Sequence, residues 1–587
     1  MAAALAALLL LSVVAVIGLM VFLSDADRAT PFIEDRIDAR LSTEVTLERG
    51  WVSAGWQPVL HLRNLDIAER GRASLINARL NPLGWLFGAR LIAFVEIDDG
   101  DWRQRLGGSE TGSPSALRHV KGVDLSSVRL ELLREGRPPS AVMIDSAAGD
   151  LASGDFSMLA TGGGATIRLG GQAAGLTLDD FDGHIGLDGE NFADFARLMG
   201  VSAADTPPYS LTGRVRHDGD VWSLEPFNGV VGDSDLTGSM ATDFSGERQL
   251  LIADLTSENL DFNDLGVIIG APSDFSAGEE NARQASVNAA YAASARLIPD
   301  ARLDFDRVRH ADARLSFRAD HVTAGVVPLN AMAFEFTLDN ALMTFEPLVF
   351  EFETGGRMET WITINARGDA VQTSVEGGLS DFDLRNIASG ALARGQLASQ
   401  FDLEMTGSDL RSAFGSANGN VSISTSTNAQ LRQLAAEGSA LDLGEVLLLI
   451  FTEEPPNLEF EAVNCAVARI EVTEGIASAN PILVDTSDSL IRMDGTVSLR
   501  TEILDLAIET DAKDVSWGNL LGGVRLGGTL RDPAVQINAV ESLLQGGAAA
   551  LLAGVAGPLA AIPFADLGLG ESLPCGELMA SQTREAP

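Results

Sequence analysis

The residue types that most often bind metals in proteins form no metal-binding pattern in this sequence. Asp179, Asp180 and Asp182 stand together like the start of a calcium loop. In the EF-hand register, however, Leu178 would take the first ligand position and Gly189 the twelfth, and neither residue can serve there. We therefore predict an acidic turn at this point and no metal site. The histidines are scattered and none has H-E-x-x-H spacing; they are His61, His119, His184, His217, His310 and His321.

Motifs for nucleotide binding and covalent catalysis are also missing. The sequence has no G-x-x-x-x-G-K-[ST], no G-x-S-x-G and no G-x-G-x-x-G. Its only lysines are Lys121 and Lys513, which leaves few candidates for Schiff-base or Ser–Lys chemistry. Adjacent carboxylates are expected by chance among 82 acidic residues and usually form a solvated face. We expect a protein that is not an enzyme and that needs no cofactor.

The two cysteines, Cys465 and Cys575, are too few for C-x-x-C chemistry or a tetrahedral zinc site. They fit either one disulfide in an oxidising compartment or two buried thiols in a reducing one. Cys575 lies in a segment flanked by proline and glycine, so a disulfide would tie that tail to the body.

The charge balance excludes one large class of partners. The 587 residues carry 41 basic and 82 acidic side chains, which gives a net charge of −41. Nucleic-acid affinity depends on a basic footprint that releases counterions, so we expect no nucleic-acid partner. The 46% apolar content is too high for a disordered chain.

A two-residue hydrophobic period dominates the chain after its first forty residues. Apolar and polar side chains alternate in three clear runs, which predicts strands with one apolar and one polar face. The apolar members of these runs are Phe334, Phe336 and Leu338, then Leu348, Phe350 and Phe352, and finally Leu504, Leu506 and Ile508.

Turn signals separate these runs. Asp339-Asn340, Gly355-Gly356, Gly368-Asp369 and Asp494-Gly495 all predict turns between strands. Strands recur through most of the chain with few long helical patterns, so we predict a mainly β, antiparallel body with a few short helices.

The first residues have a different character. Residues 2–23 carry no charge and are long enough, at about 33 Å as a helix, to cross the hydrocarbon core of a bilayer. We predict an uncleaved transmembrane anchor over residues 1–24; the alternative is a cleaved signal peptide, but the segment lacks a basic start and an A-x-A site. Residues 30–41 have helical spacing, with Pro31 at the expected first position of a short neck helix. The flanking charges do not determine the sidedness.

Composition suggests where the body divides. The polar stretch 272–286 indicates a junction between two β regions, 25–270 and 271–540. Residues 541–587 form an Ala/Gly/Leu-rich end, in which 542–565 is uncharged but interrupted by Pro558 and Pro563. We predict a broken hydrophobic helix followed by a tail; the alternative is a second membrane span.

The order of several segments resembles the AsmA-like family of envelope proteins of Gram-negative bacteria, whose distant relatives include the eukaryotic bridge-like lipid transfer proteins. The likeness covers most of residues 1–540 and is most specific from about residue 255 onward. The segments that carry it are the anchor and neck, 90–103 (RLIAFVEIDDGDWR), 259–270 (NLDFNDLGVIIG), 329–356, 378–387 (GLSDFDLRNI), 401–419 (FDLEMTGSDLRSAFGSANG), 465–475 (CAVARIEVTEG), 485–486, 493–504 (MDGTVSLRTEIL) and 527–533 (GGTLRDP).

The resemblance implies a single-pass protein of the inner membrane with its body in the periplasm, where a Cys465–Cys575 disulfide is permitted. It also implies an elongated β-groove whose apolar face holds phospholipid acyl chains, with a role in phospholipid transport and outer-membrane biogenesis. The implied partners are membrane phospholipids, the inner membrane itself and other envelope proteins. The nine apolar residues named above are the candidate groove lining.

Alternation alone does not establish a groove, because a packed β-sandwich has the same pattern. The alternative function is therefore a non-transport scaffold or assembly factor of the envelope, built as a β-sandwich or solenoid, that influences the assembly of outer-membrane proteins.

Overall fold

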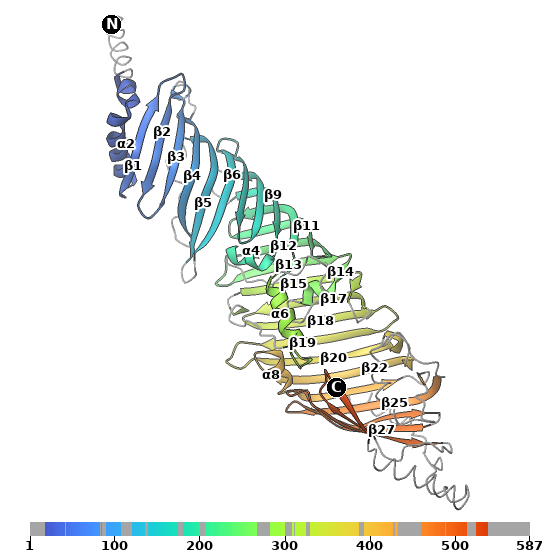
Figure 1. Ribbon diagram of the computed structural model, residues 1–587. Helices are drawn as coiled ribbons and strands as arrows, with labels where there is room; N and C mark the ends of the chain where they lie inside the picture. The colour runs from blue at the N-terminus through green and yellow to red at the C-terminus, as the bar shows by residue number, and fades with distance from the viewer. Residues whose placement is uncertain are drawn as a thin grey trace, which may run out of the picture. The chain divides into compact units, whose positions relative to one another are not determined.

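The computed structural model confirms a mainly β protein (Figure 1). It describes residues 18–41, 43–82, 84, 90–106, 120–134, 139–173, 180–199, 206–266, 282–299, 308–309, 311–324, 329–386, 393–425, 429–432, 460–487, 489–513 and 524–537. The chain divides into two compact units. The N-terminal unit comprises Met1–Gly232 and Leu236–Ser245, and the C-terminal unit comprises Asp233–Asp235 and Gly246–Pro587. The division therefore falls near residue 240, and not in the polar stretch 272–286, whose last residues begin a helix.

Most of the predicted anchor lies outside the described residues. Residues 18–24 are helical, and α2 (Ala26–Leu41) follows after a bend at Asp25. Among the described residues, no helix is long and apolar enough to span a bilayer. The predicted neck helix is present within α2, but Pro31 lies inside the helix and not at its first position. Since α2 begins upstream, Thr30 is already helical and its hydroxyl donates to the Ala26 carbonyl at 2.6 Å.

Strands of the N-terminal unit pair with their neighbours in chain order. All of the pairs from β1 to β11 are antiparallel except β4 with β5, which are parallel. The strands are β1 (Val45–Ser53), β2 (Val59–Ile67), β3 (Gly71–Leu80), β4 (Ile92–Leu106), β5 (Val120–Arg134), β6 (Ser140–Asp150), β7 (Asp155–Gly162), β8 (Ala165–Ala173), β9 (Asp180–Gly189), β10 (Tyr209–Asp218), β11 (Val221–Val231) and β12 (Ser234–Asp243).

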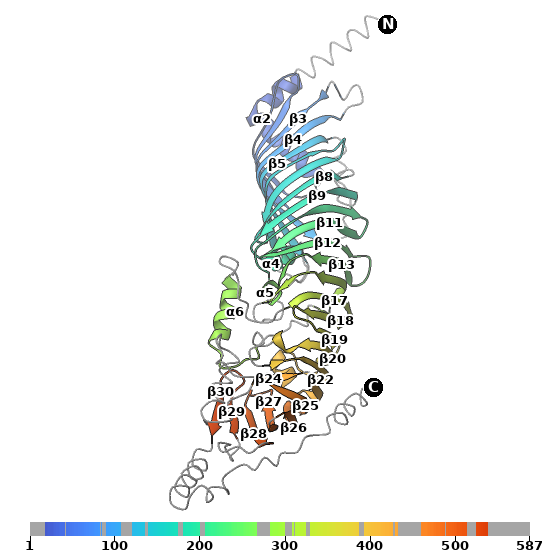
Figure 2. The same ribbon diagram turned by 90° about the vertical axis from the view of Figure 1, so that its right-hand side faces the viewer.

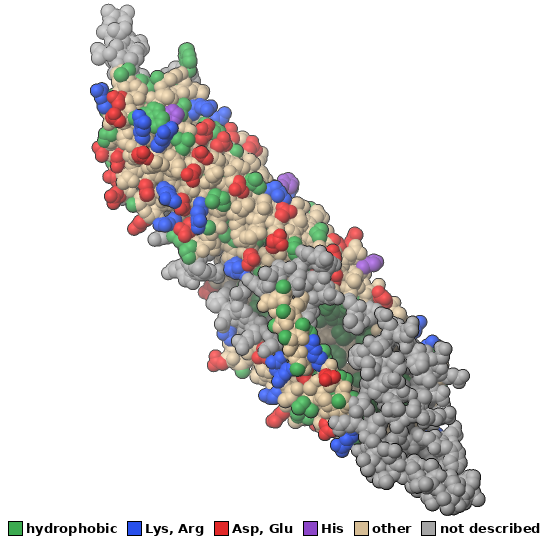
Figure 3. Space-filling model, viewed as in Figure 1, with side chains coloured by type: hydrophobic (Ala, Val, Ile, Leu, Met, Phe, Trp, Pro, Cys, Tyr) green, Lys and Arg blue, Asp and Glu red, His purple; other side chains and the backbone are tan. Residues whose placement is uncertain are grey.

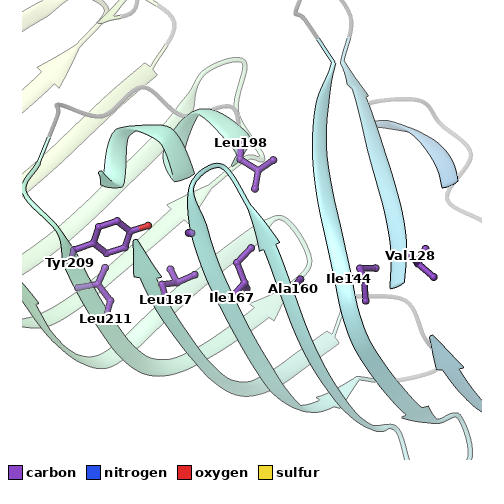
Figure 4. Close-up of a cluster of buried hydrophobic side chains, with 9 residues drawn as sticks. Val128, Ile144, Ala160, Ile167, Leu187, Leu198, Tyr209 and Leu211 are labelled. Carbon is purple, nitrogen blue, oxygen red and sulfur yellow. The ribbon is translucent and has the colours of Figure 1, made fainter. Parts of the chain in front are cut away.

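One face of this sheet is the core of the N-terminal unit. A row of apolar side chains crosses it from strand to strand, and Leu198 of α4 (Phe192–Met199) packs on that row (Figure 4). At the start of the unit, Ala29 and Ile33 of α2 cover the same face of β1 and β2. The row in Figure 4 comprises Val128, Ile144, Ala160, Ile167, Leu187 and Leu211.

A crease crosses β1 to β6, where the sheet reverses which residues face the core. Asn64, Asp99 and Ser127 have φ of 50°, 54° and 54°, a left-handed conformation that turns the following side chains to the other face. The burial of β1 records the reversal: Leu47 is buried, and beyond the crease Gly50 and Val52 are buried. The alternation of apolar and polar residues in the sequence does not predict this reversal.

The strands of the C-terminal unit also form a ladder, which is antiparallel except where β13 and β15 pair in parallel. The short strands β14 and β16 pair in parallel in a separate two-stranded sheet. Its strands are β13 (Gln249–Ser257), β14 (Leu260–Asp261), β15 (Ala311–Ala319), β16 (Val322–Thr323), β17 (Leu329–Asp339), β18 (Leu342–Phe352), β19 (Arg357–Asn365), β20 (Gln372–Asp383), β21 (Ala393–Arg394), β22 (Gln396–Thr406), β23 (Asn418–Thr425), β24 (Gln430–Arg432), β25 (Phe460–Thr473), β26 (Ile476–Thr486), β27 (Ser489–Ser498), β28 (Leu504–Ala512), β29 (Val524–Gly528) and β30 (Pro533–Ile537). Its short helices are α5 (Phe262–Gly266), α6 (Ala282–Ala292), η4 (Leu384–Asn386) and α8 (Leu410–Phe414).

Three of the four predicted turns are confirmed and one is wrong. Asp339-Asn340 begins the turn between β17 and β18, where Asn340 and Ala341 both have positive φ, as a two-residue hairpin requires. Gly355-Gly356 and residues 368–369 also lie between strands. Gly495, by contrast, lies inside β27 with φ 139°, and a Cβ there would lie 2.1 Å from the Asp505 carbonyl oxygen. This glycine allows close approach of β28 and does not make a turn.

Candidate functional site

The candidate site is one face of the C-terminal sheet, which carries two adjacent rows of uncharged residues. The strand registers place the members of each row directly opposite one another on successive strands. The Phe334 row is Leu255, Phe317, Phe334, Leu348, Thr360, Gly377, Phe401, Val421, Ile470, Ala479, Gly495, Leu506 and Leu526. The Phe336 row is Ala253, Leu315, Phe336, Phe345, Ile362, Val375, Leu403, Gly419, Val472, Ala477, Val497 and Leu504.

The opposite face of the same strands is polar and largely acidic. Each inward residue is followed by an outward one: Glu335 follows Phe334, Asp402 follows Phe401, and Asp505 precedes Leu506. These three carboxylates are exposed, whereas Phe334, Phe401 and Leu506 are half-buried. The sheet therefore separates an uncharged face, which we call the apolar face, from a charged one.

All nine residues predicted to line a groove lie on the apolar face. Phe334, Leu348 and Leu506 belong to the Phe334 row, and Phe336 and Leu504 belong to the Phe336 row. The other four are displaced by an even number of residues along the same strands and so share that face; they are Leu338, Phe350, Phe352 and Ile508.

These nine side chains differ in burial. Leu338, Phe350 and Leu504 are buried, at 7%, 9% and 8% exposure. The Phe350 ring centroid lies 6.3 Å from that of Phe262 in α5, so protein already packs on it. The other six are half-buried, and Phe336 lies 4.9 Å from the ring of Phe345. Their role as a lipid surface stays a prediction.

Sequence reading missed several members of the face. Phe345 and Leu348 are three residues apart, which in a regular strand would place them on opposite faces. The register shifts between them, at Glu346 and Pro347, and this bulge returns both side chains to the apolar face. Phe401 and Leu403, in contrast, alternate regularly with Asp402 and could have been found from the sequence.

A strap faces the sheet from the side of α5. It consists of α6 and the residues after it, 282–299. In Figure 1 α6 lies in front of the strands β17 to β19, and the turned view of Figure 2 shows it to one side of them, on the same side as α5. Figure 3, viewed as Figure 1, shows hydrophobic side chains recessed beside it. The apolar face is thus bordered by a helix and is not covered by a second sheet in the described part of the chain.

Polar contacts tie the strap to the far end of the same unit. The buried carboxylate of Glu502 accepts hydrogen bonds from the backbone N–H of Leu297 at 2.6 Å and of Ile298 at 3.0 Å. The Arg531 guanidinium donates to the Tyr291 carbonyl at 2.9 Å and lies 4.8 Å from the Tyr291 ring centroid. Charge-assisted bonds of this kind are stronger than neutral ones, so these contacts set the position of the strap.

A buried carboxyl lies near the start of this unit. Asp264 of α5 is 5% exposed and accepts a hydrogen bond from the Ser234 hydroxyl at 2.6 Å. Burial raises its pKa, the hydrogen bonds from Ser234 lower it and the nearby charge of Asp261 raises it, so that the pKa of Asp264 is about 6. Asp264 is therefore a titratable group within the packed end of the apolar face.

A second polar cluster lies at the opposite end. The ammonium of Lys513 pairs with the fully buried carboxylate of Asp485 and donates to the Thr486 carbonyl at 2.7 Å. The Asn464 amide donates to Asp485 at 2.8 Å. Cys465, opposite Asp485 in the register, is 1% exposed and disulfide-bonded. Cys575 lies outside the described residues, so the predicted Cys465–Cys575 pairing stays a prediction.

The predicted acidic turn is wrong. Asp180 and Asp182 lie within β9, and Asp179 is outside the described residues. Asp182 instead pairs with Arg214 and Arg216. The Arg214 guanidinium donates to both carboxylate oxygens, at 2.8 and 2.7 Å, and this lowers the pKa of Asp182 to about 2. Among the described residues no three His, Cys, Asp or Glu side chains are grouped so that they could hold a metal ion.

Histidines within the described range contact aromatic or polar neighbours. The His217 ring stacks on Trp222 at 4.0 Å, and the His61 ring stacks on Trp51 at 4.8 Å. His61 also hydrogen-bonds Asn77 at 2.7 Å. The other ring nitrogen of His61 hydrogen-bonds the Ser53 hydroxyl at 3.1 Å, so the His61 ring is held by Trp51, Asn77 and Ser53.

Comparison with known proteins bears on this site. Residues 223–482 match the AsmA family, and this range contains most strands of the two uncharged rows. The chain is also 27% identical over 391 residues to the AsmA family protein YhjG of Escherichia coli strain K12. The alignment covers 64% of this chain and 55% of that protein, so the chain spans about half the length of its relative. These two matches confirm the resemblance in the sequence: residues 223–482 of this chain are similar to the AsmA family.

Proposed function

We propose that the protein is a non-enzymatic envelope protein that holds phospholipid acyl chains along the apolar face of its C-terminal sheet. The observation that carries this proposal is the pair of uncharged rows, whose half-buried side chains lie opposite a strand face rich in carboxylates. Apolar surface exposed to water is unfavourable, and each CH₂ group of a bound chain that leaves water contributes about 0.8 kcal/mol.

The rows are long enough for several lipids. Thirteen hydrogen-bonded strands at their usual spacing extend over about 58 Å. A bilayer core about 30 Å thick holds two acyl chains end to end, so the rows could accommodate several phospholipids in single file. The absence of charge along both rows leaves no step at which an acyl chain would have to pass a desolvated ion.

The proposed location is the inner membrane, with residues 1–24 as a single anchor and the body in the periplasm. Support comes from the uncharged segment 2–23 and from the match of residues 223–482 to the AsmA family. A disulfide-bonded Cys465 suits an oxidising compartment. We infer a contribution to outer-membrane biogenesis through phospholipid transport, with membrane phospholipids and other envelope proteins as partners.

Lipid content of the purified protein tests this proposal. Val421 lies in the Phe334 row, and its neighbour Asn420 is exposed on the charged face. In Val421→Glu, a carboxylate beside the acyl chains should lower the phospholipid that co-purifies with the detergent-extracted protein by about tenfold or more, because desolvating the charge is costly. Asn420→Glu adds the same charge on the other face and should leave the lipid unchanged.

Mass spectrometry of the extracted lipids gives the readout, and thermal unfolding checks that both variants are folded. Equal lipid in wild type and Val421→Glu would contradict the proposal. It would favour the alternative, an envelope scaffold or assembly factor whose apolar face is packed by protein.

A further inference from the structure

A cationic and aromatic cluster occupies the β1–β2 hairpin of the N-terminal unit. Arg49 and Arg63 lie directly opposite each other in the register, and Trp51 is opposite His61. The two guanidinium carbons are 5.8 and 5.5 Å from the centroid of the Trp51 ring, and His61 stacks on that ring. The cluster lies on the face away from the core, because Gly50 is buried between Arg49 and Trp51.

The two arginines differ from many others in this sheet. Arg103 pairs with Glu131 and Arg168 with Asp188, whereas Arg49 and Arg63 have no ion pair within the described part of the chain. Like charges directly opposite each other on neighbouring strands are destabilising. Two guanidiniums held on one aromatic ring form a fork suited to phosphate oxygens. The chain carries a net charge of −41, so this positively charged cluster stands out from the acidic surroundings. Its charge would attract an anion.

The hairpin lies level with the end of the apolar N-terminal segment. The Gly50 N–H donates to the Thr30 hydroxyl at 3.0 Å, which fixes β1 against α2. The strand β1 runs antiparallel to α2. Three residues of β1 beyond Gly50 extend about 10 Å, and the same length of helix contains about seven residues, counted back from Thr30. Ser53 therefore lies level with Leu23, where the uncharged segment ends.

The loop after Ser53 presents a large exposed side chain at this level. Trp56 is 87% exposed, and Val21 and Phe22 of the neighbouring helical residues are 64% and 38% exposed. Exposed tryptophan is costly in water but is favoured at the boundary between hydrocarbon and headgroups. If residues 2–23 cross a bilayer, Trp56 lies at that boundary. Arg49 comes four residues before Ser53, so its backbone lies about 13 Å from the level of Ser53 along the strand. This distance is little more than the range over which the surface potential of the membrane acts.

We propose that the β1–β2 hairpin is a second membrane contact, in which Trp56 enters the headgroup region and Arg49 and Arg63 face the phosphates of anionic phospholipids. The inference rests on the proposed membrane anchor. The hairpin would hold the N-terminal unit against the bilayer at a fixed orientation. A single membrane helix cannot do this, because the unit remains free to rotate about the helix axis.

The test uses the full chain reconstituted in bilayer discs of phosphatidylcholine mixed with phosphatidylglycerol. A photo-crosslinking residue replaces Trp56, and a matched one replaces Val221, an exposed apolar residue at the start of β11. Lipid adducts should form at position 56 and not at 221. They should be enriched in phosphatidylglycerol, and Arg49→Gln with Arg63→Gln should reduce that enrichment by about fivefold per arginine.

Arg314→Gln with Arg318→Gln removes the same charge from exposed positions of β15 and should leave the enrichment unchanged. Absence of lipid adducts at 56, or an enrichment that survives loss of Arg49 and Arg63, would overturn the inference. Release of the protein from membranes by alkaline carbonate would instead show that the proposed transmembrane anchor is wrong. The lipid bound along the Phe334 row is measured separately, by the comparison of wild type with Val421→Glu.

Discussion

At the scale of single residues, Asp264 links stability to pH. Its folded pKa of about 6 exceeds the usual 3.8, so between these values the folded protein keeps a proton that the unfolded chain has lost. The contribution of protonated Asp264 to the free energy of unfolding is complete below about pH 4. It is lost as the pH rises through about 6, and the total loss is roughly 3 kcal/mol.

Replacing Asp264 with Asn removes this titration while keeping an uncharged partner for Ser234. The stability of Asp264→Asn relative to wild type should therefore rise between about pH 4 and 7 in urea unfolding at a series of pH values. Asp243→Asn is the control of opposite sign: hydrogen bonds from Ser245 lower the pKa of Asp243, so its contribution is lost as the pH falls. Parallel curves for wild type and Asp264→Asn would show that Asp264 is not buried as described.

Lys513 provides a second residue-scale prediction. Its side chain is 11% exposed and its partner Asp485 is fully buried. Lys513→Met should lower the free energy of unfolding by about 3–5 kcal/mol, because the carboxylate is left buried without its charge partner. Lys121→Met changes the only other lysine, which is exposed, and should stay within about 0.5 kcal/mol of wild type. Similar unfolding midpoints for the two variants would contradict the buried pair.

At the scale of elements, the strap 282–299 depends on one carboxylate. Glu502→Ala removes the acceptor for the N–H groups of Leu297 and Ile298. Losing such a charged acceptor costs about 2 kcal/mol, so these amides should exchange with deuterium roughly thirtyfold faster while the strands β17 to β19 keep their protection. Glu474→Ala, at the exposed turn between β25 and β26, is the matched control. Unchanged exchange at 297 and 298 would show that the strap is held by other contacts.

The elements also show how far sequence reasoning reaches. Regular alternation was enough to place Phe334, Phe336 and Leu506 on one face, because side-chain direction in a strand has a strict period of two. It failed where the backbone departs from that period: at the bulge before Leu348, and at the crease where Asn64 takes a left-handed conformation. Local sequence also does not specify which distant strands pair in parallel, and so gave neither the β4–β5 nor the β13–β15 pairing.

Burial was the least predictable property. Phe350 and Phe352 alternate with glutamates in the same way as Phe334, yet Phe350 is packed against Phe262 and Phe352 lies 4.7 Å from Phe382. Contacts between residues far apart in the chain decide which members of an apolar face remain accessible. Position 350 is for this reason a poor site for detecting lipid, and Phe401 is a better one.

At the scale of the whole molecule, the two uncharged rows and the charged face of the same strands form one continuous amphipathic surface in the C-terminal unit. The match to the AsmA family, over residues 223–482, covers most of that surface. A lipid surface requires that its apolar residues contact acyl chains along several strands, and a protein scaffold requires that they contact only protein. The two functions therefore differ at the same residues.

Photo-crosslinking in cells at matched inward and outward positions separates them most directly. The inward positions are Phe334 on β17, Phe401 on β22 and Leu506 on β28, and their outward neighbours are Glu335, Asp402 and Asp505. Our account predicts phospholipid adducts at all three inward positions and at none of the outward ones. Crosslinks from the inward positions to protein alone would contradict it.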